Sequence, residues 1–199
     1  FDIFMKRITG SSLLYAKLCL KYGKELKIKE AEEICKKIAT PVAYDMLQQI
    51  CRKKIRWLCE KNEYEGNADS IVAVIDLMNQ TIEYCKKASE KKEYLIEKTI
   101  LIASEVESII NNTLIWKFGD TLELDAIYQK IISLYEWATE EIPKSLFSIP
   151  EKDRLYAKIQ GFYLDDFEVY RAAHYSNMEK AYYYQNLLDE LRKNTKPYE

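Results

Sequence analysis

Four basic residues fall within five positions of the segment VAYDMLQQICRKKIR, which covers residues 42–56: Arg52, Lys53, Lys54 and Arg56. Guanidinium groups bind phosphate and carboxylate oxygens in pairs, and arginine clusters that read phosphorylated motifs are a recurring binding mode. Positions 52 and 56 share one face of a helix. The spacing therefore predicts either an anion site or the solvated, mixed-charge face of a helix.

Residues for other kinds of chemistry are scarce. His174 is the only histidine, which excludes histidine-based catalytic triads, histidine-based metal sites and the Glu-x-x-His pairs of helical di-iron proteins. An Arg171/His174 pair is physically possible, but it is more typical of a solvated helix end. The chain has no Gly-rich phosphate loop and no Gly-x-Ser-x-Gly elbow. We therefore expect no enzyme activity, no cofactor and no metal.

The cysteines are odd in number and form no Cys-x-x-Cys pair: Cys19, Cys35, Cys51, Cys59 and Cys85. This pattern is typical of reduced thiols in the core of a cytoplasmic helical protein rather than of disulfides or zinc ligands.

The composition favours long helices. Hydrophobic residues make up 48% and charged residues 31%, with only five Gly and four Pro in 199 residues. The formal charge of −2 argues against nucleic-acid binding. The apolar runs are much shorter than the roughly 20 residues needed to cross a membrane. We expect an all-α fold with no membrane segment.

Apolar periodicity and capping signals predict eight helices, at about residues 11–26, 29–39, 41–62, 69–89, 94–117, 122–146, 151–173 and 177–195. Ser11 or Ser12 is the expected N-terminal cap of the first helix, and we expect Gly23 to weaken or break the later part of that helix. Thr40-Pro41 predicts a helix start, and Asp120 or Thr121 another. Ile149-Pro150 predicts a stop, since a residue before proline avoids the helical region.

Several segments match parts of one helical family in order. Val42-Ala43-Tyr44 matches the start of that family's third helix, and Arg52 and Arg56 then fall on two of its arginines. IPEKDRLYAKIQGFYLDDFEVY is similar to its fourth-to-fifth helix junction, and KAYYYQNLLDELRKNTKP to its sixth helix. The chain thus resembles 14-3-3 proteins, which implies an antiparallel helical bundle of the 14-3-3 type.

The resemblance also implies a phosphopeptide groove, with substitutions. Arg52 matches an arginine that holds the phosphate, and Lys158 a basic residue of the groove. The family's third-helix lysine falls on Asp45, and its fifth-helix arginine and tyrosine on Asp165 and Asp166. Carboxylates repel phosphate, so we expect phosphoserine or phosphothreonine recognition to be altered or lost. Our hypothesis is that Asp165 or Asp166 pairs with Arg52 or Arg56.

The chain departs from the family in length. About 40 extra residues lie between the matched segments, and the sequence ends before the family's last three helices. It also begins at Phe1 rather than at Met, so we expect a fragment or trimmed chain. We expect one all-helical domain over residues 1–199, truncated before those helices or lacking them. The family implies a homodimer through the N-terminal helices, for which Leu14, Leu18 and Leu20 supply apolar surface; packing only within the monomer is the alternative.

Three functions stay open. The favoured one is a cytoplasmic, non-enzymatic 14-3-3-like adaptor in signalling, which binds protein or phosphopeptide ligands. A second is a helical scaffold of the tetratricopeptide type that binds unphosphorylated segments on a surface rich in tyrosine, at Tyr182, Tyr183 and Tyr184. A third is a helical enzyme or small-ligand binder of a new kind.

Overall fold

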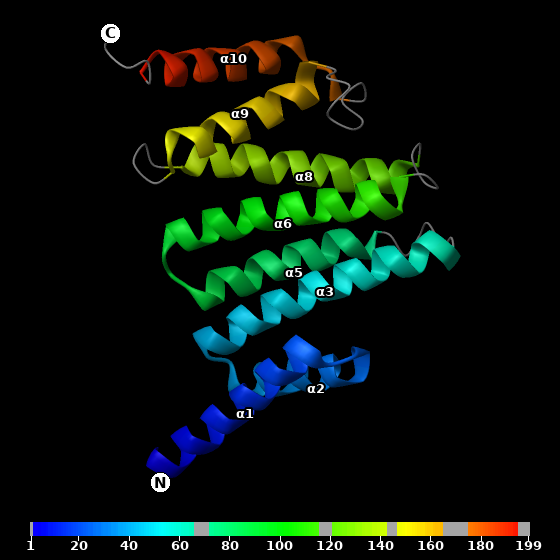
Figure 1. Cartoon of the computed structure of the whole chain (residues 1–199), viewed down its shortest axis with the longest axis vertical. Helices are drawn as coiled ribbons and strands as arrows, with labels where there is room; N and C mark the ends of the chain where they lie inside the picture. Colours follow the sequence, from blue (N-terminus) through cyan, green and yellow to red (C-terminus); the bar gives the residue numbers. More distant parts are fainter. Residues whose placement is uncertain (1, 66–71, 116–120, 143–146, 165–174, 195–199) are drawn as a thin grey trace. The chain divides into compact units, whose positions relative to one another are not determined.

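The computed structural model describes residues 2–65, 72–115, 121–142, 147–164 and 175–194, which contain eight α-helices and no strand (Figure 1). The predicted all-α class is confirmed. The chain divides into two compact units, residues 1–128 and 129–199, and the boundary falls inside helix α8. Each unit is described by itself below. The single domain and the 14-3-3 type stay predictions.

The first unit holds five helices and the beginning of a sixth: α1 (Asp2–Tyr22), α2 (Glu25–Ile38), α3 (Pro41–Glu65), α5 (Ala73–Ala88), α6 (Lys92–Thr113) and the first residues of α8 (Leu122–Glu141). Helix α3 is central, since it contacts α1, α2, α5 and α6. Helices α3, α5 and α6 run side by side in alternating directions (Figure 1). This layer brings α3 next to α6, which matters for the basic segment.

The core of the first unit follows the apolar periodicity of α3. Leu47, Ile50 and Ile55 are at most 1% exposed. All five cysteines are buried free thiols, as predicted for reduced thiols in a helical core. Burial raises the pKa of Cys35 and Cys51 to about 11 and that of Cys59 and Cys85 to about 12. These thiols are therefore protonated packing groups rather than nucleophiles.

The second unit contains the rest of α8 together with α9 (Ile149–Leu164) and α10 (Met178–Lys193), and α9 packs on α10. Its core includes Tyr135, Phe162 and Leu188, each at most 1% exposed. The rings of Tyr163 and Tyr184 stack with their centroids 6.3 Å apart. Stacked tyrosine rings therefore help to pack α9 against α10.

Several helix starts follow the predicted capping signals. The backbone N–H of Ala43 donates to Thr40 Oγ1 at 3.3 Å, directly before Pro41 begins α3. The N–H of Leu124 donates to Thr121 Oγ1 at 3.4 Å at the start of α8. Asn177 caps α10 by accepting the N–H of Lys180 at 3.1 Å.

Both predicted boundaries of α1 are wrong. Helix α1 begins at Asp2, so Ser11 and Ser12 lie inside it rather than at its start. A hydroxyl group inside a helix is tolerated, so neither serine has to mark a helix start. Its predicted end near Leu26 is also too late, because the helix stops at Tyr22, before the predicted break at Gly23. The predicted start near Asp69 lies outside the described residues. The predicted ends near Lys117 and Leu146 are too late, because α6 ends at Thr113 and α8 at Glu141.

Ile149-Pro150 begins α9 instead of stopping a helix. Ser148 precedes it, and both its N–H and its Oγ donate to Glu151 Oε2, at 2.9 and 2.6 Å. This is part of a capping box, in which the third helical residue reaches back to the cap. Proline in the first turn removes an N–H that has no helical partner, so the dipeptide suits a start.

Gly23 provides a test of the α1–α2 junction. Its N–H donates to Cys19 O at 2.7 Å, and an added Cβ would lie 2.3 Å from that oxygen and 2.7 Å from Lys27 Cβ. We expect Gly23→Ala to destabilise the protein by about 1–3 kcal/mol, because the backbone must shift. Gly10→Ala is the control: a Cβ there meets nothing within 4 Å, so it should stabilise α1 by roughly 0.5–1 kcal/mol. Urea unfolding of both variants distinguishes these outcomes, and equal effects would contradict the junction geometry.

Candidate functional site

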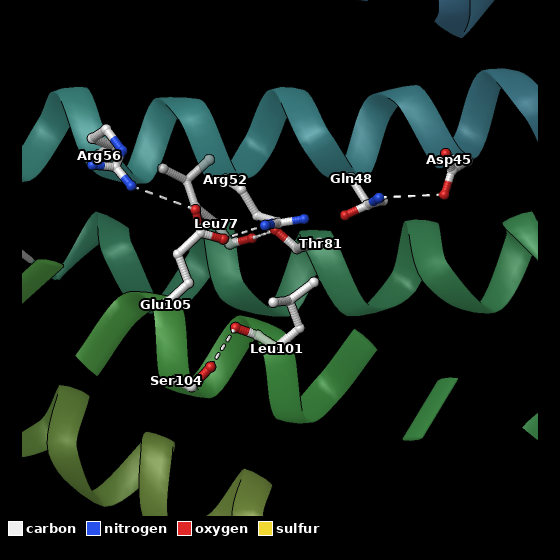
Figure 2. Close-up of polar contacts among 9 residues, drawn as sticks. All are labelled: Asp45, Gln48, Arg52, Arg56, Leu77, Thr81, Leu101, Ser104 and Glu105. Carbon is white, nitrogen blue, oxygen red and sulfur yellow. Dashed lines mark hydrogen bonds and ion pairs between the residues drawn. The ribbon is translucent and has the colours of Figure 1, made fainter. Parts of the chain in front are cut away.

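Arg52 and Arg56 lie one turn apart on α3 and point toward the same carboxylate on α6 (Figure 2). Arg52 Nε donates to Glu105 Oε2 at 2.5 Å, and Arg56 Nη2 lies 3.6 Å from Glu105 Oε1. The predicted common direction of the two arginines is confirmed. Their shared ion-pair partner among the described residues is Glu105.

The packing of α3 and α6 explains this contact. Ile102, Val106 and Ile109 are buried on α6, and Glu105 borders that apolar stripe. The side chains of Arg52 and Glu105 are 20% and 24% exposed, whereas that of Arg56 is 52% exposed. The Arg52–Glu105 pair is therefore partly shielded from water, which strengthens it relative to a surface ion pair.

We call these three residues the Arg52–Arg56–Glu105 cluster. Its net charge is +1. A phosphate group carries nearly two negative charges at neutral pH. It would have to displace Glu105 from the guanidinium groups or accept its repulsion at short range. Arg56 keeps exposed surface, but the better-placed guanidinium of Arg52 is already neutralised. The cluster is thus an ion-paired group within the first unit.

Asp45, which the sequence resemblance predicts at the position of a phosphate-binding lysine, is also engaged within the first unit. Its carboxylate accepts hydrogen bonds from Tyr94 Oη at 2.5 Å, Gln49 Nε2 at 3.0 Å and Gln48 Nε2 at 3.3 Å. Burial and the hydrogen bond to Asp45 raise the pKa of Tyr94 above its ordinary value. Gln48 lies between Asp45 and Arg52 along α3 (Figure 2). Asp45 therefore ties α3 to α6 at a second place.

Lys54 points to a different helix from the two arginines. Its Nζ donates to Glu32 Oε2 on α2, and Lys36 Nζ donates to Glu32 Oε1 at 2.7 Å. Burial of Glu32 raises its pKa, but the two lysine hydrogen bonds lower it by more, so the net pKa lies below its ordinary value. The four basic residues of the segment therefore do not converge on one ligand.

The remaining predicted site residues belong to the second unit or lie outside the description. Lys158 on α9 places its Nζ 5.8 Å from the ring centroid of Tyr135 on α8. Its role beside Arg52 stays a prediction. Asp165 and Asp166 lie outside the described residues, and their pairing with Arg52 or Arg56 is untested.

The sequence prediction missed Glu105 because it is one of 32 acidic residues and belongs to no matched motif. The available signal was its place at the edge of the apolar stripe of α6, which predicts a side chain directed at a neighbouring helix. No described set of three or more histidine, cysteine, aspartate or glutamate side chains is arranged to hold a metal ion. Within the described part of the chain, every helix is too short or too polar to cross a membrane.

Comparison with known proteins adds no relative: no protein-family model, curated protein or solved structure matches the chain.

Replacing Glu105 tests the importance of the cluster. Glu105→Gln leaves Arg52 partly buried without a carboxylate, so we expect the free energy of unfolding to fall by about 1–3 kcal/mol. The matched control is Glu83→Gln, which removes an exposed pair with Lys86. That change should cost less than about 0.5 kcal/mol. Chemical denaturation measures both, and a Glu105→Gln effect as small as the control would contradict a structural role.

Glu32 provides a pH test. Because its folded pKa is lower than the ordinary value of 4.5, the carboxylate stabilises the fold above that value. This stability is lost as the pH falls through the lowered pKa. We expect Glu32→Gln to destabilise the protein at neutral pH and the difference from the original chain to vanish in acid. Urea unfolding across a pH series measures it, and a pH-independent difference would contradict the ion pairs with Lys36 and Lys54.

Proposed function

We propose that the chain is a non-enzymatic, protein-binding adaptor of the cytoplasm whose Arg52–Arg56 pair does not act as a phosphate clamp. The observation that carries the proposal is an apolar surface on α1. Ile8, Leu14, Tyr15, Leu18 and Tyr22 are all exposed, although each is a large hydrophobic residue. Apolar surface of this kind, gathered on one face, is typical of protein interfaces.

The exposed residues of α1 form a continuous face. At 3.6 residues per turn they fall within roughly a third of the helix circumference. Ala16 and Leu20, which lie elsewhere on the helix, are buried in the first unit, so the prediction that Leu20 supplies apolar surface for a dimer is wrong. Helix α1 therefore has more apolar surface than its own unit covers.

A groove of about 380 Å³ continues this face toward α3, with Leu13, Leu14, Val42 and Met46 among its lining residues. Lys17 and Asp45 also line it, so the groove offers one charge of each sign. A two-fold dimer needs a self-complementary patch, and an apolar face beside one charge of each sign supports such a pairing. A second copy of the chain is the occupant we propose, in a homodimer through the N-terminal helices.

The Arg52–Arg56–Glu105 cluster supports the loss of phosphate recognition. The positions that resemble the family's clamp are matched by an internal carboxylate, which competes with any phosphate for the same donors. The five reduced thiols support the cytoplasmic location, because they are typical of that compartment.

A second function is favoured by one observation. Tyr182 and Tyr183 on α10 are 63% and 57% exposed, whereas Tyr184, predicted to share their surface, is buried and stacks on Tyr163. Aromatic side chains are common in protein interfaces. A helical scaffold of the tetratricopeptide type would use them to bind an unphosphorylated segment.

Substitution on α1 tests the dimer. We expect Leu14→Lys/Leu18→Lys to raise the dimer dissociation constant by more than about tenfold, since each buried leucine contributes roughly 1.5–3 kcal/mol. Leu122→Lys is the control, because Leu122 is 84% exposed on α8 and lies on neither α1 nor α3. Light scattering coupled to size-exclusion chromatography gives the mass. A monomer before substitution, or equal dissociation in both variants, would contradict the interface.

A phosphoserine peptide library, compared with its unphosphorylated twin, tests the phosphate claim. We expect phosphate to improve binding by less than about twofold, because Glu105 already neutralises Arg52. Preferential binding of the phosphorylated library by tenfold or more would overturn the claim. Strong and equal binding of both libraries that is lost on Tyr182→Ser/Tyr183→Ser would favour the scaffold function.

A further inference from the structure

The second unit contains an open pocket of about 360 Å³ that no part of the proposed function uses. It lies where α10 begins, over one face of α8 and beside the end of α9. Most of its lining residues are polar: Gln129, Ser133, Glu136, Tyr163, Ser176, Asn177 and Lys180. A polar pocket of this volume is within the range of small-molecule sites.

Three of these side chains form a compact hydrogen-bonded group. Tyr163 Oη donates to Glu136 Oε1 at 2.6 Å, and Lys180 Nζ donates to the same oxygen at 2.8 Å. Lys180 Nζ also donates to Tyr163 Oη at 3.0 Å. Glu136 lies on α8, Tyr163 on α9 and Lys180 on α10. The packing of the three helices therefore fixes the positions of the ammonium group and the carboxylate.

The group keeps one acceptor and one donor for a ligand. The hydrogen bonds from Tyr163 and Lys180 both go to Oε1 of Glu136, so Oε2 can accept a hydrogen bond from a ligand. Lys180 Nζ uses two of its three N–H groups on Glu136 and Tyr163, so the third can be donated to a ligand. Helix α10, which has 16 residues, begins at the pocket with Asn177 as its cap. Its amino-terminal end adds partial positive charge on the side of Lys180.

The charges of Glu136 and Lys180 cancel, so the pocket favours neither a simple anion nor a simple cation. A ligand that carries both charges close together matches a carboxylate beside an ammonium group. Two less polar residues, Ile132 and Tyr175, also line the pocket and offer a surface for an aliphatic or aromatic group.

We propose that this pocket binds a free α-amino acid. Its ammonium group contacts Glu136, its carboxylate contacts Lys180 and the start of α10, and its side chain lies against Ile132 and Tyr175. This site belongs to the second unit and is independent of the dimer surface on α1.

The protonation states agree with this assignment. Hydrogen bonds with Glu136 and Tyr163 raise the pKa of Lys180 above its ordinary value, so its ammonium group is charged at neutral pH. Burial and the hydrogen bond to Glu136 raise the pKa of Tyr163 to about 12, so it stays a hydrogen-bond donor.

The first experiment measures the thermal unfolding of the full chain with each of the twenty L-amino acids. A ligand that binds only the folded state raises the unfolding temperature with its concentration. We expect at least one amino acid with an apolar side chain to do so. No shift with any of the twenty would overturn the proposal.

The second experiment compares the best amino acid with its N-acetyl derivative and its amide, by calorimetric titration. Acetylation removes the ammonium charge and amidation removes the carboxylate charge, so each derivative should bind at least tenfold more weakly. If either derivative bound as tightly as the free amino acid, the proposal would be overturned, because the pocket would then not recognise one of the two charges.

Variants locate the site. Glu136→Gln and Lys180→Met should each weaken binding by at least tenfold, whereas Asp153→Asn should leave it unchanged. The control removes an ion pair with Arg192 that joins α9 to α10 away from the residues lining the pocket. Circular dichroism establishes that each variant is folded. Unchanged binding in the folded Glu136→Gln variant, or equal loss in the control, would place the ligand elsewhere and overturn the proposal.

Discussion

The ion pair between Arg52 and Glu105 is the constraint on which the functional account of the first unit depends. Arg52 Nε on α3 lies 2.5 Å from Glu105 Oε2 on α6, and the two side chains are only 20% and 24% exposed. An arginine in such a place needs a carboxylate, because an unpaired, partly buried charge is costly. The same pairing supports our proposal that this arginine does not clamp an external phosphate, because Glu105 competes for the same donors.

The basic segment has other such partners. Lys54 is paired with Glu32 on α2, and Asp45, an acidic residue in the same helix, is held by Tyr94 on α6. Helix α3 therefore uses its charged residues to fix its position among its neighbours. Large apolar residues stay exposed on α1, and it is there that we propose a binding surface for this unit. In the second unit, Glu136 and Lys180 are paired as well, but they line an open pocket, and that difference makes them candidates for a ligand.

The fold class and most helices could be predicted from the sequence, because apolar periodicity and caps such as Thr40, Thr121 and Asn177 are local signals. Boundaries failed where two local signals conflicted: Ser11 and Ser12 look like caps but lie inside a helix, and Ile149-Pro150 suits a start as well as a stop. The common direction of Arg52 and Arg56 followed from helical spacing. Their partner did not, because the choice of Glu105 depends on how α3 packs on α6, which is tertiary information. The same holds for Glu136, Tyr163 and Lys180, which are far apart in sequence.

A double-mutant cycle on Arg52 and Glu105 tests the central claim most directly. The free energy of unfolding is measured for the original chain, Arg52→Met, Glu105→Gln and the double variant. A direct ion pair predicts a coupling energy of about 1–3 kcal/mol, with the double variant nearly as stable as either single one. Additive effects, with a coupling energy near zero, would show that Arg52 is not held by Glu105 and would contradict the account.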